Sequence, residues 1–219
     1  MSTFTRSIFA PLAACLAALS IGQGVPSAPH LTVAEKSAFL LMNPQVRTEV
    51  KLSSAQQAAV VKAISNYSTS QEKLFASKNP LDKEIKAVDI SFAKNALAVV
   101  DNAQEKKLLA LTIKQVGVTA LSDKGIAARI GLTRAQSAKV AVGISKISRR
   151  KLAFDEMLAK GLAHIPGDND AEKSANRTAV LKSYDSERIK LKSDLKSLEA
   201  SVVASLTAPQ RAKWQALQS

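Results

Sequence analysis

One short pattern occurs three times along the chain: leucine, then serine or threonine, two further residues, and glutamine. A hydroxyl residue with glutamine three positions later forms a capping box, in which the two side chains bond to each other's backbone N–H groups at the start of a helix. The leucine before the cap can pack onto the first helical turn. Each copy therefore predicts a chain turn followed by a new helix. The copies are Leu52-Ser53-x-x-Gln56, Leu132-Thr133-x-x-Gln136 and Leu206-Thr207-x-x-Gln210.

A fourth, degenerate copy has aspartate as the cap and runs Val100-Asp101-x-x-Gln104. The boxes at Ser53 and Thr133 lie 80 residues apart, and at that offset apolar positions of the chain match one another. The matches include Val50 with Ile130, Val60 with Val140 and Ile64 with Ile144. Self-similarity at a fixed offset indicates a duplicated unit. We therefore predict two related helical units, residues 29–118 and 121–219, behind an N-terminal segment of residues 1–28.

Each unit is predicted to contain a short helix, two long helices and a terminal helix. Apolar residues recur at spacings of three and four along the long segments, which predicts helices packed as antiparallel hairpins. Only 4% of the residues are aromatic, and no segment alternates apolar and polar residues as a strand does. The predicted fold class is all-α. The expected helices are 44–50, 54–77, 81–99 and 102–118 in the first unit, and 123–130, 134–160, 171–205 and 208–218 in the second.

Residues 1–28 have the layout of a secretory signal peptide. Arg6 supplies the positive charge, an apolar run extends from Ile8 to Ile21, and small and polar residues follow. The run is too short for a comfortable membrane span. We therefore expect a periplasmic or secreted protein after cleavage of this signal peptide. Two alternatives stay open: a lipoprotein cleaved at Leu12-Ala13-Ala14-Cys15, and an uncleaved apolar anchor.

The repeated Leu-Thr-x-x-Gln box, in a basic, helical, cysteine-poor chain with an export segment, resembles the LTXXQ-motif family of Spy/CpxP-like envelope proteins. The resemblance covers positions 52–56, 132–136 and 206–210 and the helical arrangement of nearly the whole mature chain, although the first box has Ser53 for threonine. It implies a helical cradle, usually a dimer, that holds unfolded proteins without ATP on a basic and apolar face. Other relatives damp envelope-stress signalling or sense metals. Two units in tandem depart from the family pattern, so the oligomeric state stays open.

The formal net charge of +13 attracts anionic partners, which include acidic proteins, nucleic acid and anionic lipid. Nucleic acid conflicts with export, so we expect unfolded or acidic protein clients, or the anionic envelope surface. The most basic stretch is residues 134–163, where cations are mixed with apolar side chains. The alternative interpretation of this stretch is a solvated helix face. The candidate binding residues are Arg149, Arg150, Lys151, Leu152 and Phe154.

Metal and catalytic motifs are not found in the sequence. A metal site needs three or four converging ligands, and the soft-metal candidates do not cluster. These candidates are His30, Met42, Met157 and His164. Asp168, Asp170 and Glu172 are interpreted as a helix entry, with Asp170 as the cap, rather than as a calcium loop.

No nucleophile elbow, phosphate loop or zinc-protease motif occurs, so we expect neither a catalytic residue nor a cofactor. A serine–lysine dyad stays open, because its members can be distant in the chain. We interpret three further aromatic residues as packing residues rather than stacking platforms. These are Tyr67, Tyr184 and Trp214.

Overall fold

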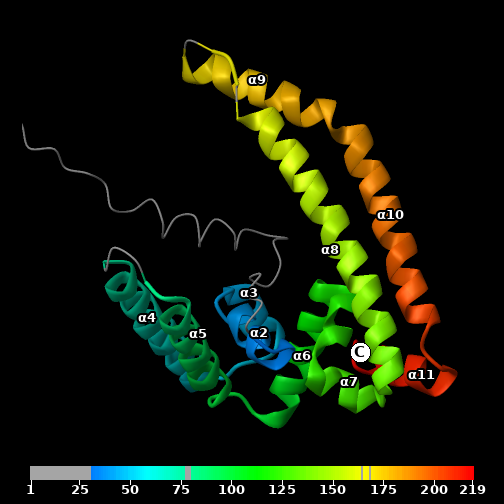
Figure 1. Ribbon diagram of the computed structural model, residues 1–219. Coiled ribbons are helices and arrows are strands. Elements are labelled where there is room, and N and C mark those ends of the chain that lie inside the picture. The colour runs from blue at the N-terminus through cyan, green and yellow to red at the C-terminus, as the bar shows by residue number, and fades with distance from the viewer. Residues whose placement is uncertain (1–30, 77–79, 164, 168) are drawn as a thin grey trace, which may run out of the picture. The chain divides into compact units, whose positions relative to one another are not determined.

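The computed structural model describes residues 31–76, 80–163, 165–167 and 169–219, and within these ranges the protein contains helices and no strand (Figure 1). The predicted all-α fold class is therefore confirmed. No helix in these ranges combines the length and the apolar character needed to span a membrane. The expected signal peptide, residues 1–28, lies outside the described residues.

Packing divides the chain into two compact units. Unit 1 runs up to Gly125 and includes Gln215–Ser219, and unit 2 comprises Ile126–Trp214. The sequence places the boundary a few residues earlier, between 118 and 121. The difference arises because a 3-10 helix, η1 (Gly117–Ser122), continues the last helix of unit 1 and contributes the buried Val118 and Leu121 to it.

Unit 1 is built on the pair of long helices α4 (Ser54–Ala76) and α5 (Asp82–Leu97), which pack side by side (Figure 1). The short helices α2 (Val33–Leu40) and α3 (Pro44–Glu49) precede this pair, and α6 (Asn102–Val116) follows it. Helix α2 packs against both α5 and α6. Its Phe39 ring meets the rings of Tyr67 and Phe92 edge-on, with centroid distances of 5.8 and 4.9 Å. These rings lie in one continuous apolar core.

Helix α2 is absent from the sequence-based prediction. It begins with a capping box of its own, in which Thr32 accepts from the N–H of Glu35 at 3.1 Å and Glu35 accepts from the N–H of Thr32 at 2.7 Å. Leu31 before the cap is buried, as are Leu52 and Leu206. The segment therefore has the same design with glutamate in place of glutamine.

Unit 2 is built on α8 (Arg134–Leu162) and α10 (Asp185–Ala204), which pack along each other (Figure 1). Helix α7 (Lys124–Ile130) precedes them, α9 (Asp170–Ser183) lies between them in sequence, and α11 (Ala208–Ala216) follows. The fully buried side chains lie toward the end of the pair that carries the boxes. They are Ile126, Ile130, Val140, Ile147, Val202, Leu206 and Trp214.

The single long helix predicted over 171–205 is wrong, because the chain breaks at Tyr184 into α9 and α10. Tyr184 has φ −93° and ψ 5°, which lies outside the α-helical region. Its ring packs against Gly161 of α8, so closely that a β-carbon on Gly161 would stand 2.5 Å from the tyrosine Oη. The bend therefore coincides with a close contact between Tyr184 and α8, which is possible because Gly161 has no side chain.

A second close approach in unit 2 yields a prediction. A β-carbon on Gly143 of α8 would stand 2.5 Å from Cγ2 of Val202 on α10. Gly143→Leu should therefore overpack this contact and lower the free energy of unfolding by about 1–3 kcal/mol, although leucine is the better helix former. Urea unfolding followed by circular dichroism measures the change.

Ala141→Leu is the matched control, because Ala141 lies on the same helix and is exposed. We expect it to change the free energy of unfolding by no more than about 0.5 kcal/mol. Equal effects of the two substitutions would contradict the close packing of α8 on α10.

Candidate functional site

The boxes predicted from the sequence form helix starts in the structure. In unit 2, Thr133 Oγ1 accepts from the N–H of Gln136 at 3.2 Å, and Gln136 Oε1 accepts from the N–H of Thr133 at 3.0 Å. Ser53 and Gln56 make the same pair of bonds at 3.2 and 2.9 Å. The degenerate and final boxes also start helices, through the bonds of Asp101 with Gln104 and of Thr207 with Gln210.

Boxes that are distant in sequence meet in pairs. In unit 1, Gln56 Nε2 donates to Gln104 Oε1 at 2.8 Å, and Gln104 Nε2 donates back to Gln56 Oε1 at 3.1 Å. In unit 2, Gln136 Nε2 donates to Gln210 Oε1 at 2.7 Å, and Gln210 Nε2 donates back to Gln136 Oε1 at 2.9 Å. Each unit therefore joins the start of its long helix to the start of its last helix through two reciprocal amide bonds.

The chain turn before each long helix takes part in the same arrangement. Lys51 and Gly131 occupy matching positions at the offset of 80 residues, and both have positive φ, 59° and 76°. Their carbonyl oxygens accept from the second glutamine of each pair, Gln104 Nε2 at 3.2 Å and Gln210 Nε2 at 2.7 Å. Glycine adopts this conformation without strain, whereas Lys51 carries a steric cost.

The leucines of the boxes are buried to different degrees. Leu52 and Leu206 are 5% and 2% exposed, whereas Leu132 is half-buried. Each leucine therefore contributes apolar burial directly before a box that takes part in a junction.

Glutamine suits this junction better than glutamate does. The carbonyl oxygen of the amide accepts from its own cap, and the NH₂ group donates to the partner box. A carboxylate accepts only, and two carboxylates in contact would repel each other. Consistently, glutamate stands where a box is unpaired: Glu35 accepts from Thr32 N–H, and Glu84 accepts from Leu81 N–H at 3.0 Å. The glutamine of the motif therefore serves the pairing as well as the cap.

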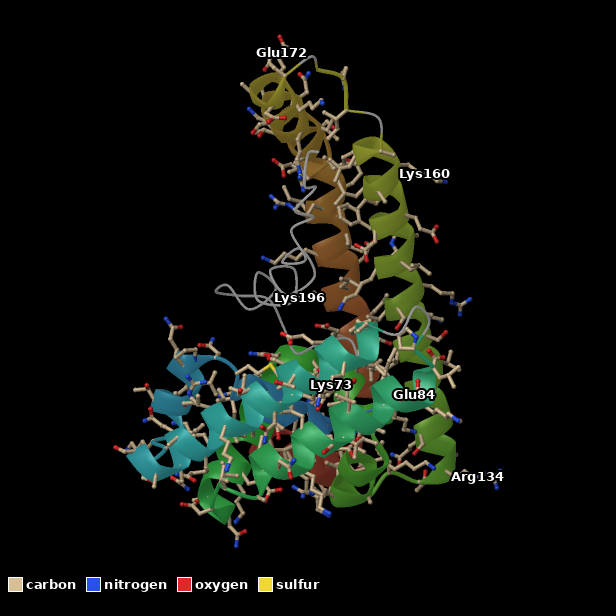
Figure 2. All side chains as sticks on the ribbon, turned by 90° about the vertical axis from the view of Figure 1, so that its left-hand side faces the viewer. Lys73, Glu84, Arg134, Lys160, Glu172 and Lys196 are labelled. Carbon is tan, nitrogen blue, oxygen red and sulfur yellow. The ribbon has the colours of Figure 1, made fainter. Side chains whose placement is uncertain are left out.

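The candidate binding residues do not form one cluster. Arg150 Nε donates to the carboxylate of Asp194 on α10 at 3.0 Å. Phe154 is half-buried on the side of α8 that faces α10. Arg149, Lys151 and Leu152 are exposed, Leu152 by 57%. Figure 2 shows Arg134 and Lys160, near the two ends of α8, extended into solvent. Of the cations on α8, Arg150 therefore bonds across to α10, whereas Arg149 and Lys151 are exposed to solvent.

A groove of about 230 Å³ opens beside Phe154, between α8 and α10. Its apolar wall consists of Phe154, Met157 and Leu191, and charged side chains from both helices surround it. The groove could not be predicted from the sequence, because its α10 residues lie more than thirty positions from Phe154 in the chain. The lining residues are Arg150, Ala153, Phe154, Met157, Glu187, Lys190 and Leu191.

The remaining candidate residues lie apart. His30, His164 and Asp168 are outside the described residues, Met42 packs against the core of unit 1, and Met157 lines the groove. Within the described residues no three histidine, cysteine, aspartate or glutamate side chains gather as a metal site would require. The cap of α9 is Asn169, which accepts from the N–H of Glu172 at 2.9 Å, so the assignment of Asp170 as the cap is wrong.

Comparison with known proteins identifies no relative: no family model, no curated protein and no solved structure matches the chain. The fold and the junctions therefore define the class by themselves. The protein is an all-α protein whose two packed units each close on a pair of glutamine capping boxes.

Exchanging glutamine and glutamate tests the paired boxes. Gln136→Glu removes the donor to Gln210 Oε1 and sets a carboxylate against that oxygen, so the free energy of unfolding should fall by about 1–3 kcal/mol. Glu35→Gln, the reverse exchange in an unpaired box, should change it by no more than about 0.5 kcal/mol. Urea unfolding monitored by circular dichroism measures both.

The effect of Gln136→Glu should also depend on pH. The protonated carboxyl can donate to Gln210, so its pKa in the folded protein would lie above the usual value of about 4.3. Protonation then favours the folded state. The loss in free energy of unfolding relative to wild type should therefore be largest at neutral pH and should shrink as the pH falls toward 4. A deficit that does not change with pH, or an equal deficit in Glu35→Gln, would argue against the pairing.

Proposed function

We propose that this protein is an exported, non-catalytic binder that holds unfolded or acidic protein segments without ATP. The observation that carries the proposal is a set of exposed apolar side chains on the long helices of unit 2. Val142 is 56% exposed, Leu152 57% and Ile189 68%. A contiguous apolar patch exposed on a protein surface commonly marks an interaction site.

Basic side chains accompany these apolar ones. Lys146, Arg149, Lys151 and Lys190 are all exposed on the same two helices. Cations attract acidic segments over a distance set by the salt concentration, and apolar groups then hold the segment by contact. This combination tolerates many sequences, as a holding protein requires. The export segment and the resemblance to Spy-like proteins support the same function.

An aggregation assay tests this function. At a near-stoichiometric ratio the protein should suppress light scattering by several unrelated proteins diluted from denaturant. Suppression should weaken as the salt concentration rises from about 0.1 M to about 1 M, because screening shortens the range of the charges from about 10 Å to about 3 Å. A protein that ignores all such clients and retains one partner would instead be a dedicated structural or partner-binding module.

The apolar surface can be tested by a triple variant. Val142→Ser, Leu152→Ser and Ile189→Ser together should reduce suppression several-fold, while the helix content stays unchanged because these side chains are exposed. A matched triple of exposed alanines on the same helices, Ala135→Ser, Ala141→Ser and Ala200→Ser, should leave suppression unchanged. Equal suppression by the two triples would refute the role of this surface.

A further inference from the structure

The groove between α8 and α10 has an apolar wall and a charged edge. Phe154, Met157 and Leu191 are each half-buried, so their contact surfaces are only partly covered by the protein itself. Lys190 and Glu187 of α10 and Arg150 of α8 lie around them. A groove of about 230 Å³ accommodates one or two apolar side chains of a partner, but not a large ligand.

The flank of α8 that faces this groove is basic. Residues three, four, seven or eleven positions apart share one side of a helix. Lys139, Lys146 and Arg150 therefore lie on the same side, and Lys160 follows seven residues after the groove residue Ala153. Lys139, Lys146 and Lys160 are exposed and make no ion pair within the described residues. Only Arg150 is engaged, by Asp194.

Unit 1 shows what kind of element packs along such a pair of helices. There the short helix α2 lies against α5, and its Phe39 contacts Tyr67 of α4 and Phe92 of α5. Unit 2 begins with α7, so among its described residues it has no helix that corresponds to α2. A helix supplied by another protein could use the same mode of packing at the groove.

We propose that this groove binds an acidic amphipathic helix of a partner protein. One apolar side chain of that helix enters between Phe154, Met157 and Leu191. Its carboxylates lie over Lys190 and the α8 flank, where they find opposite charge. The proposal rests on the proposed binding function and names the site and the chemistry of the bound segment.

Two other occupants fit less well. A second copy of this chain has a formal charge of +13 and would be repelled. An anionic lipid surface offers phosphates, yet Glu187 and Asp194 lie at the groove and beside it and oppose bare anions. A helix can set its apolar residue near these carboxylates and its acids over the lysines, so its pattern matches the groove.

The experiment measures binding of a fluorescein-labelled peptide of about 20 residues, long enough to form a helix, with leucine at helical spacing and glutamate elsewhere. Fluorescence anisotropy with the purified full chain should show saturable binding. Ala153→Phe, which fills the groove at an exposed position, should weaken binding about tenfold or more. Lys190→Glu should weaken it similarly and reduce its dependence on salt.

Each variant has a control of the same chemistry outside the groove. Ala141→Phe adds the same ring at another exposed position of α8. Lys192→Glu makes the same charge change at an exposed position of α10 that does not line the groove. Both should bind the peptide as wild type does. An equal loss of peptide binding in a variant and its control would refute the groove as the binding site. Unchanged peptide binding by Lys190→Glu would refute it even if Ala153→Phe failed to fold.

Three further probes distinguish the occupants and the two proposals. A peptide of the same composition in scrambled order should bind at least about tenfold more weakly. Vesicles of anionic phospholipid that bind while the peptide does not would overturn the protein helix as occupant. Suppression of aggregation that persists in Ala153→Phe would leave the holding function standing and refute the groove as its site. Absent suppression with intact peptide binding would refute the holding function alone.

Discussion

The reciprocal bond between two glutamine amides is the constraint on which each unit depends. It joins two helix starts that lie 48 residues apart in unit 1 and 74 apart in unit 2. For these starts to meet, the intervening chain must go out along one long helix and return, so a hairpin is the economical solution. The junction also satisfies backbone donors that every helix start leaves open. One small polar cluster thereby fixes both the local helix starts and the closure of the unit.

The position of the junction determines where apolar side chains of unit 2 stay partly uncovered. Unit 2 is closed at one end of α8, and its fully buried residues on the long helices, Val140, Ile147 and Val202, lie on that half of the pair. Farther along, α10 is the main neighbour of α8, and α9 contacts α8 but buries no residue, so Phe154, Met157 and Leu191 stay half-covered. In unit 1, α2 packs on the rings of Tyr67 and Phe92, whereas Phe75 of α4 is 56% exposed. Limited cover, rather than a special residue, leaves the groove in unit 2 open.

Much of this fold follows from local chemistry, and so it could be predicted from the sequence. The caps at Ser53, Thr133 and Thr207 act within four residues, and the helix starts after them are correct to the residue. Helix α2 escaped prediction because its box carries Glu35. The bend at Tyr184 could not be foreseen, since the apolar spacing continues through it and the contact that coincides with it is made to Gly161, more than twenty residues away in the chain. Two features depend on tertiary contacts and cannot be predicted from residue spacing within one segment. They are the pairing of the boxes and the lining of the groove by residues from both α8 and α10.

Charge and apolar surface have to be considered together in this protein. Exposed side chains such as Leu152 and Ile189 would, on a neutral protein, favour association of identical copies. A formal charge of +13 opposes that association, because every copy repels every other. The same charge attracts an acidic chain, so the one property that discourages self-association also favours the proposed acidic partner. The glutamine pairs fit this arrangement because their amides are neutral, and the carboxylate of Asp101 in the unit 1 junction accepts from the N–H groups of Ala103 and Gln104. The junctions therefore hold each unit closed with little negative charge to compete with the proposed acidic partner for the surface cations.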